Sequence, residues 1–236
     1  MFQVNKSLIN IFTFSMALLV FSNISFAQKN KKTKAVDEAH IQYTMTAEGG
    51  MAAAMSGTTM DLFFTPSHAK VIANMMNGLM KMDVRIDNAK SKGIMLIDMM
   101  GQKKVIEMGE EDLKKSKAKN QKPTEVVYTK KYKKIAGYKC QEARVTLDGM
   151  DEPAIVYVTD KITPSNVGDV SMMQFTGLKG FPLSWKIEQQ GMIINMEAVA
   201  VSLEKLDKSV FDIAIPEGYE KMNIEDLQGL GGSFGM

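Results

Sequence analysis

The chain has 236 residues, of which 29 are Lys or Arg and 27 are Asp or Glu, so its formal net charge is +2. This length is sufficient for one sizeable core, and the near-neutral balance gives no overall field that would attract nucleic acid or an anionic membrane. Two histidines and the single cysteine, Cys140, do not have the spacing of a structural zinc site and allow no intramolecular disulfide.

The first 27 residues have the pattern of a secretory signal peptide. Lys6 is followed by the mostly apolar stretch 9–21, and residues 25–27 place small side chains where a signal peptidase reads. The uninterrupted apolar centre, residues 16–21, is much shorter than the roughly 20 residues that span a bilayer. We therefore expect cleavage after this segment, a mature protein without a transmembrane segment, and a periplasmic or secreted location. Gln28 follows the cut, so the thiol of a lipoprotein anchor is missing.

Composition divides the remaining chain into three parts. Residues 28–38 are polar and basic and predict a flexible leader, residues 39–222 contain the patterned segments of a single domain, and residues 223–236 predict a disordered, glycine-rich tail. No strand precedes these glycines and no helix follows them, so they do not predict a phosphate-binding loop.

Alternation of apolar and polar side chains predicts strands throughout the domain. In residues 41–48, Ile41, Tyr43, Met45 and Ala47 share one side. The clearest strand covers residues 80–87, with Met80, Met82, Val84 and Ile86 facing inward and Lys81, Asp83, Arg85 and Asp87 facing outward. Further strands are expected at residues 62–64, 70–73, 94–100, 103–108, 125–135, 138–147, 154–159, 183–190 and 192–205.

Little of the domain is left for helices. Acids at residues 110–112 followed by lysines at 114–119 suit a helix dipole and predict one short surface helix. In residues 163–180, Pro164 and Gly168 precede an apolar centre, and Gly177 and Gly180 follow it. This pattern predicts a long loop or short helix that lies over the sheet. The fold class is thus mainly β, a β-rich α+β arrangement built on an antiparallel sheet.

No catalytic constellation is visible, and we expect no enzyme activity and no cofactor. Neither histidine lies near a nucleophile elbow, and no paired carboxylates stand out. Cys140 lies in a strand-like run, where a free cysteine is more often a buried hydrophobe than a reactive thiol. Trp185 either fills the core of the sheet or lines the rim of a pocket.

Methionine is the unusual component, with 21 in the chain. A buried Met contributes about 1.5–3 kcal/mol by area but loses up to about 2 kcal/mol of side-chain freedom, so it suits a rigid core poorly. Flexible thioethers suit a cavity that adapts to acyl chains or several ligands. The alternative is that Met replaces Leu in an ordinary core.

Soft thioether ligands also select Cu(I). Methionines four residues apart occur at residues 51 and 55, 76 and 80, 95 and 99, and 192 and 196. On a strand this spacing separates two side chains by about 13 Å, too far for one ion. Only Met51 and Met55 lie in a segment that could be helical, where such neighbours meet.

Four segments of the chain resemble an uncharacterised exported bacterial family, a domain of unknown function that is similar to the Lol-type periplasmic lipoprotein carriers. They are residues 134–140 (KIAGYKC), 155–160 (IVYVTD), 180–183 (GFPL) and 211–219 (FDIAIPEGY). The resemblance spans roughly residues 40–222 and rests on turns and strand ends. It implies an open, curved antiparallel half-barrel with short helices or a lid on the concave side and an apolar cavity between them. It transfers no catalytic residues.

The first hypothesis is therefore a periplasmic carrier for an apolar ligand such as a lipid, an acyl chain or a lipoprotein. The expected ligand-binding residues are Tyr43, Met45, Met80, Met82, Val84, Ile86 and Trp185, with Met51, Met55, Met172, Met173 and Phe175 as lid residues. The second hypothesis is an envelope interaction or sensor module with a closed core, and the third is Cu(I) binding through Met. Nucleic acid is not among the expected partners. Apart from Cu(I) in the third hypothesis, no metal is expected.

Overall fold

The structure is a computed structural model that describes residues 36–49, 55–118, 123–147, 152–164, 178–189, 191–224 and 226. The expected signal peptide, residues 28–35 of the expected leader and most of the expected tail lie outside these ranges. The same is true of the lid candidates Met51, Met172, Met173 and Phe175. Within the described ranges, no helix combines the length and the apolar character needed to cross a bilayer.

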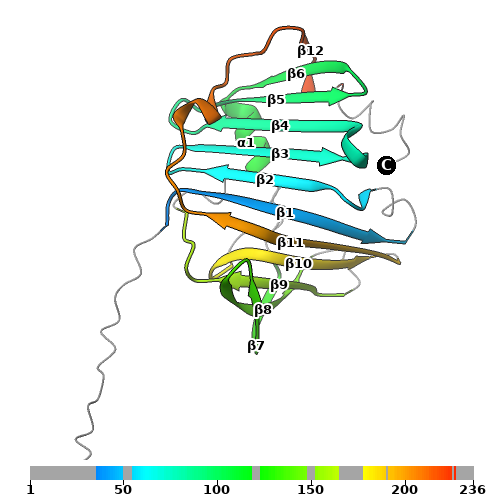
Figure 1. Cartoon of the computed structure of the whole chain (residues 1–236), viewed down its shortest axis with the longest axis vertical. Helices are drawn as coiled ribbons and strands as arrows, with labels where there is room; N and C mark the ends of the chain where they lie inside the picture. Colours follow the sequence, from blue (N-terminus) through cyan, green and yellow to red (C-terminus); the bar gives the residue numbers. More distant parts are fainter. Residues whose placement is uncertain are drawn as a thin grey trace, which may run out of the picture. The chain divides into compact units, whose positions relative to one another are not determined.

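The described strands form one twelve-stranded sheet in the order β12-β6-β5-β4-β3-β2-β1-β11-β10-β9-β8-β7 (Figure 1). The strands are β1 (Ala39–Glu48), β2 (Thr59–Phe64), β3 (His68–Met75), β4 (Met80–Asp87), β5 (Lys92–Met99), β6 (Gln102–Met108), β7 (Glu125–Ile135), β8 (Tyr138–Thr146), β9 (Ala154–Thr159), β10 (Phe181–Gln189), β11 (Met192–Ser202) and β12 (Glu220–Lys221). Single turns η2 (Met76–Gly78) and η4 (Lys208–Phe211) and one helix, α1 (Glu110–Ala118), complete the described elements.

This curved, unclosed sheet confirms the expected fold class, an open half-barrel. Strands that are neighbours in sequence pair antiparallel from β1 to β6 and from β7 to β11. The two halves are joined where β1 pairs with β11. One pairing departs from the antiparallel pattern, because β12 lies parallel to β6.

The inner face of the sheet is the face that carries Ile41 and Tyr43. Both side chains are buried, whereas Gln42 and Thr44 between them are exposed, as the alternating pattern of this strand predicts. The largest buried cluster lies on this face and brings Leu62 and other residues of β1–β3 together with residues of β8–β11. The inner face is therefore filled where the sheet curls over itself.

Helix α1 covers the inner face of β4–β6 near one end of these strands. Leu113 is buried there against Ile86, Ile106 and Met108. The carboxylate of Asp112 accepts a hydrogen bond of 2.9 Å from the N–H of Gly109, which satisfies a free donor at the start of the helix. The expected surface helix is thus confirmed, and its one apolar side chain holds it to the sheet.

The alternation predicts that the outer face of β4 is exposed to water, but part of this face is covered in the structure. Asp83 and Asp87 are buried, because the chain after β11 crosses this face. Arg85 donates to both carboxylate oxygens of Asp83, at 3.1 and 2.8 Å, and to the carbonyl oxygen of Asp212 at 2.6 Å. Asp83 and Arg85, which the sequence predicts to face solvent, therefore form an ion pair, and Arg85 also holds the crossing segment.

The crossing segment, residues 203–221, adds an apolar contact and covers an edge. Ile213, Ile215 and Tyr219 pack against the outer side chains of β5 and β6. Phe211 is buried, with its ring 5.3 Å from that of His68. The segment ends in β12, which occupies the outer edge of β6, so this edge of the sheet has a partner.

The opposite edge of the sheet is β7. Among the described strands it pairs only with β8. The strand is rich in Lys, with residues 130, 131, 133 and 134 all basic, and its middle is exposed. Charge on an edge strand opposes pairing with another chain.

We expect Phe211→Ala to lower the free energy of unfolding by about 3 kcal/mol, because a buried aromatic side chain is lost and the crossing segment loosens. Leu203→Ala is the control, since Leu203 is 46% exposed in the same segment and should change stability by less than about 0.5 kcal/mol. Urea denaturation of the full chain measures both. Equal stability of the two variants would show that the segment is not held by its apolar contact.

Candidate functional site

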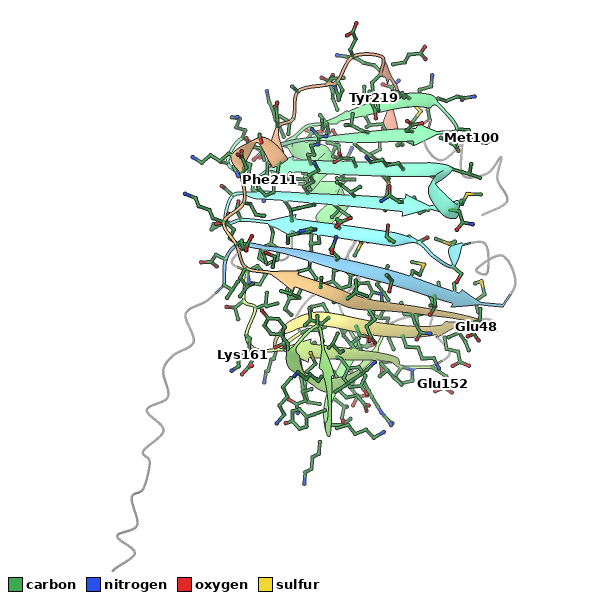
Figure 2. The ribbon with its side chains drawn as sticks, in the orientation of Figure 1. Glu48, Met100, Glu152, Lys161, Phe211 and Tyr219 are labelled. Carbon is green, nitrogen blue, oxygen red and sulfur yellow. The ribbon has the colours of Figure 1, made fainter. Side chains whose placement is uncertain are left out.

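A row of methionines crosses the inner face at one end of the strands. Cross-strand pairing places Met45 of β1 opposite Met196 of β11, and Met80 of β4 opposite both Met75 of β3 and Met99 of β5. Side chains directly opposite each other in a sheet have Cβ atoms about 4.5–5.5 Å apart, so these methionines lie side by side. We call Met45, Met75, Met80, Met99 and Met196 the methionine row. Sulfur atoms gather at this end of the sheet in Figure 2, near Met100.

The row differs in exposure along its length. Met196 is buried, next to Trp185 on the neighbouring strand, whereas Met75, Met80 and Met99 are half-buried. The same difference continues one step deeper, where Tyr43 and Met60 are buried but Met82 is half-buried. The inner face is thus closed near β1 and β11, and its partly accessible side chains lie on β4, at Met95 and Met99 of β5 and at Met75 at the end of β3.

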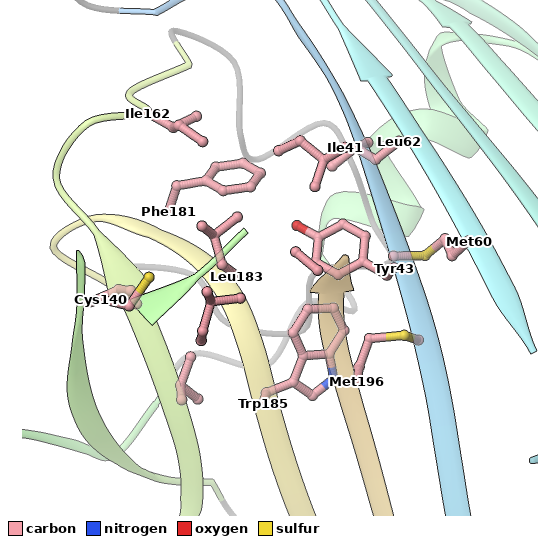
Figure 3. Close-up of a cluster of buried hydrophobic side chains, with 14 of the residues drawn as sticks. Ile41, Tyr43, Met60, Leu62, Cys140, Ile162, Phe181, Leu183, Trp185 and Met196 are labelled. Atoms are coloured by element: carbon pink, nitrogen blue, oxygen red, sulfur yellow. The ribbon is translucent and has the colours of Figure 1, made fainter. Parts of the chain in front are cut away.

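The closed part is held by aromatic packing and one buried hydrogen bond. The ring centroid of Tyr43 lies 5.5 Å from that of Trp185. Figure 3 shows the two side chains next to each other. The hydroxyl of Tyr43 donates to the carbonyl oxygen of Pro182 at 3.0 Å, and burial raises the pKa of Tyr43 well above its usual value. Tyr43 and Trp185 therefore fill the core at the back of the site, which is the structural alternative that the sequence left open for Trp185.

The accessible part is apolar and flexible. Met82, Val84 and Met95 are half-buried on β4 and β5, and Ile86 at the far end of β4 is buried beneath α1. The ionised neighbour on this face, Lys104 of β6, lies opposite Ile97 and pairs with Glu220 at 2.5 Å. A ligand held here would meet apolar side chains and no unpaired charge from these strands.

Two turns at the same end expose further methionines. Met76, after β3, is 43% exposed with a φ of +53°, and Met100, after β5, is 69% exposed with a φ of +52°. Left-handed backbone is unfavourable for a residue with a side chain, and glycine or asparagine is the usual choice there. The N–H of Met100 donates to the carbonyl oxygen of Leu79 at 2.9 Å, which ties the two turns together.

The expected site residues thus fall into three groups. Met80, Met82 and Val84 lie together on β4, while Met45 is half-buried on β1 against the closed cluster and Met55 lies in the segment that leads into β2. Tyr43, Ile86 and Trp185 are buried behind or beside them. The rest lie outside the described residues. Sequence reasoning missed Met75, Met95 and Met99, although Met95 and Met99 share the inward alternation of β5 and could have been found from it.

The contacts around His40 do not form a nucleophilic relay with Ser202. Nε2 of His40 lies 2.7 Å from the Asp61 carboxylate, and Ser202 lies opposite His40 in the register of β1 and β11. The hydroxyl of Ser202, however, accepts from the N–H of Glu204 at 3.3 Å and makes no hydrogen bond with the imidazole. This His–Asp pair stacks on Phe63 on the outer face and has a structural role there.

Conventional metal ligands are also dispersed. In the part of the chain that the structure describes, no group of three His, Cys, Asp or Glu side chains could hold an ion.

Cys140 is buried in the closed core, where its thiol donates weakly to the carbonyl oxygen of Tyr138 at 3.6 Å. Burial raises the pKa of Cys140 to about 11. The main-chain N–H of Ile135 and the charge of Lys133 lower this pKa by less, and the charge of Glu197 adds a small increase. Because the thiolate is the reactive form, this environment suppresses its chemistry.

No family model matches the chain, and no curated protein matches it. Similar solved structures include the Mycobacterium tuberculosis lipoprotein LppX, at 12% identity and a TM-score of 0.37 over 70% of this chain and 86% of that one. They also include LprF from Mycobacterium bovis (9%, 0.37, 78% and 91%) and a β-barrel-like protein of a domain of unknown function from Brucella abortus (9%, 0.31, 72% and 99%). Likeness at this level carries no argument about a ligand.

We expect Cys140 in the folded protein to react with a thiol reagent at pH 8 at least about 100-fold more slowly than in urea, because the folded state disfavours its thiolate. The rate of colour release from an aromatic disulfide reagent measures this. The raised pKa also means that this thiol lowers stability as the pH rises from the unfolded value, near 8.5, toward about 11. Equal rates in buffer and in urea would contradict the burial.

Proposed function

We propose that the protein is a carrier that holds an apolar ligand, such as a lipid or acyl chain, against the half-buried inner face of β3–β5. The observation behind the proposal is the difference in exposure along one continuous face: Met196 and Tyr43 are buried, but Met80, Met82 and Val84 remain accessible. An ordinary closed core would bury all of them.

The side chains suit such a ligand. Burial of one methylene group is worth about 0.8 kcal/mol, so a chain of ten methylenes covered on all sides would gain on the order of 8 kcal/mol before the entropy of binding is subtracted. Methionine adapts its shape at low cost, so several chain lengths fit the same surface. The signal peptide predicted in the first 27 residues supports a role in the periplasm or outside the cell, where lipids and lipoproteins pass between membranes.

The filled cluster supports a second candidate, an envelope interaction module without cargo. Leu62 of β2 and Val156 of β9 belong to one buried cluster, so part of the interior is closed by the protein's own side chains. In this candidate, the accessible surface on β3–β5 contacts a protein partner and not a ligand.

We expect native mass spectrometry of gently purified protein to detect a bound lipid, and a fluorescent fatty acid to bind the delipidated chain. Met82→Glu should weaken probe binding by about tenfold or more, because a carboxylate on the half-buried face must lose water when the apolar probe binds. Val199→Glu is the matched control, since Val199 is 57% exposed on β11.

Circular dichroism and the unfolding midpoint show whether each variant is folded, and Met82→Ala provides a second variant without charge. Protein that is free of lipid and does not bind the probe would exclude the carrier and leave the interaction module. Equal loss of binding in the Met82 and Val199 variants would place the ligand elsewhere.

A further inference from the structure

We propose that the exposed end of the methionine row, Met75, Met80 and Met99, binds a single Cu(I) ion through thioether sulfur. This inference goes beyond the carrier function and does not depend on it. It differs from the pairs four residues apart that the sequence suggested, because Met95 and Met99 lie along one strand, β5, as do Met192 and Met196 along β11. That spacing separates the side chains by about 13 Å.

Pairing across strands places the three methionines side by side instead. Met80 is flanked on one side by Met75 and on the other by Met99, each in direct register. Adjacent strands are about 4.8 Å apart, and the three side chains project from the inner side of a curved sheet, where neighbouring side chains converge. Long, unbranched thioethers can therefore meet over the central strand.

The chemistry of this end favours a soft monovalent ion. Thioethers are neutral and soft, and they select Cu(I) over the harder divalent ions that prefer carboxylate or imidazole. The nearest carboxylate in the register, Asp98, belongs to the outer face and accepts a hydrogen bond from the N–H of Gly101 at 3.0 Å. Because all three methionines are half-buried, an ion bound there stays near solvent and avoids full desolvation of its charge.

The two turns provide an independent observation. Each of the hairpins that holds the row ends in a Met-Met pair, Met75-Met76 and Met99-Met100, and in each pair the second residue is exposed and left-handed. A side chain in this conformation costs on the order of 1 kcal/mol relative to glycine, and an exposed Met gains little from packing. Two extra thioethers beside the row would instead pass an incoming ion to it.

Titration of the full chain with Cu(I) under anaerobic conditions, against a chromophoric Cu(I) chelator, tests the site. We expect one equivalent to bind, with X-ray absorption showing sulfur ligands. Loss of one outer-shell partner already lowers metal affinity by about 10- to 100-fold, so Met80→Leu, which removes a ligand, should cost at least tenfold. Met108→Leu is the control, because Met108 is buried at the other end of the same face.

Met→Leu substitution keeps the apolar volume and removes only the sulfur, so it separates this inference from the carrier function. Binding of the fluorescent fatty acid to the copper-free wild-type chain is measured separately and reports only on the carrier function. Failure of the wild-type chain to take up Cu(I), equal affinity of Met80→Leu and wild type, or nitrogen and oxygen ligands in the absorption spectrum would each overturn the copper site. None of these results would affect the carrier, which fails only if the apolar probe does not bind.

Discussion

The pairing of β1 with β11 is the contact on which the rest of the molecule depends. It joins a strand at the start of the domain to one near its end, and it places Met45 beside Met196 and Tyr43 beside Ala198. Without it, β1–β6 and β7–β11 would be two separate sheets, each with an uncovered apolar face. Because contacts between residues so distant in sequence form late and at an entropic cost, this seam also sets the difficulty of folding.

The pairing of β1 with β11 explains why one part of the inner face is buried and another part is partly accessible. Close to this pairing, the sheet curls and side chains from both halves fill the space, so Tyr43 and Trp185 are held by rings and a buried hydrogen bond. Farther away, β3–β5 face α1 at one end only, and their methionines at the other end remain accessible. Binding a flexible ligand requires this combination, a rigid back wall beside an adaptable surface.

Local pattern predicted the strands well, because alternation in segments such as 41–48 and 80–87 directly reflects a buried and an exposed face. It failed for Asp83 and Asp87, since their cover is supplied by a segment more than 120 residues later. The methionine row was also hidden from sequence: Met75, Met80 and Met99 become neighbours only through strand register, which spacing along the chain does not reveal. Inward alternation indicated the correct face, but not which part of it would be filled.

The two edges of the sheet are protected by different means, and this affects association between copies of the protein at high concentration. One edge is partly covered by the two-residue strand β12, while β7 carries lysines and an irregularity in its register with β8 between Tyr128 and Tyr132. If two copies met along their β7 strands, their like charges would repel each other, and this repulsion weakens as salt rises. Acidic polymers that neutralise these lysines would therefore weaken this part of the restraint on edge-to-edge association.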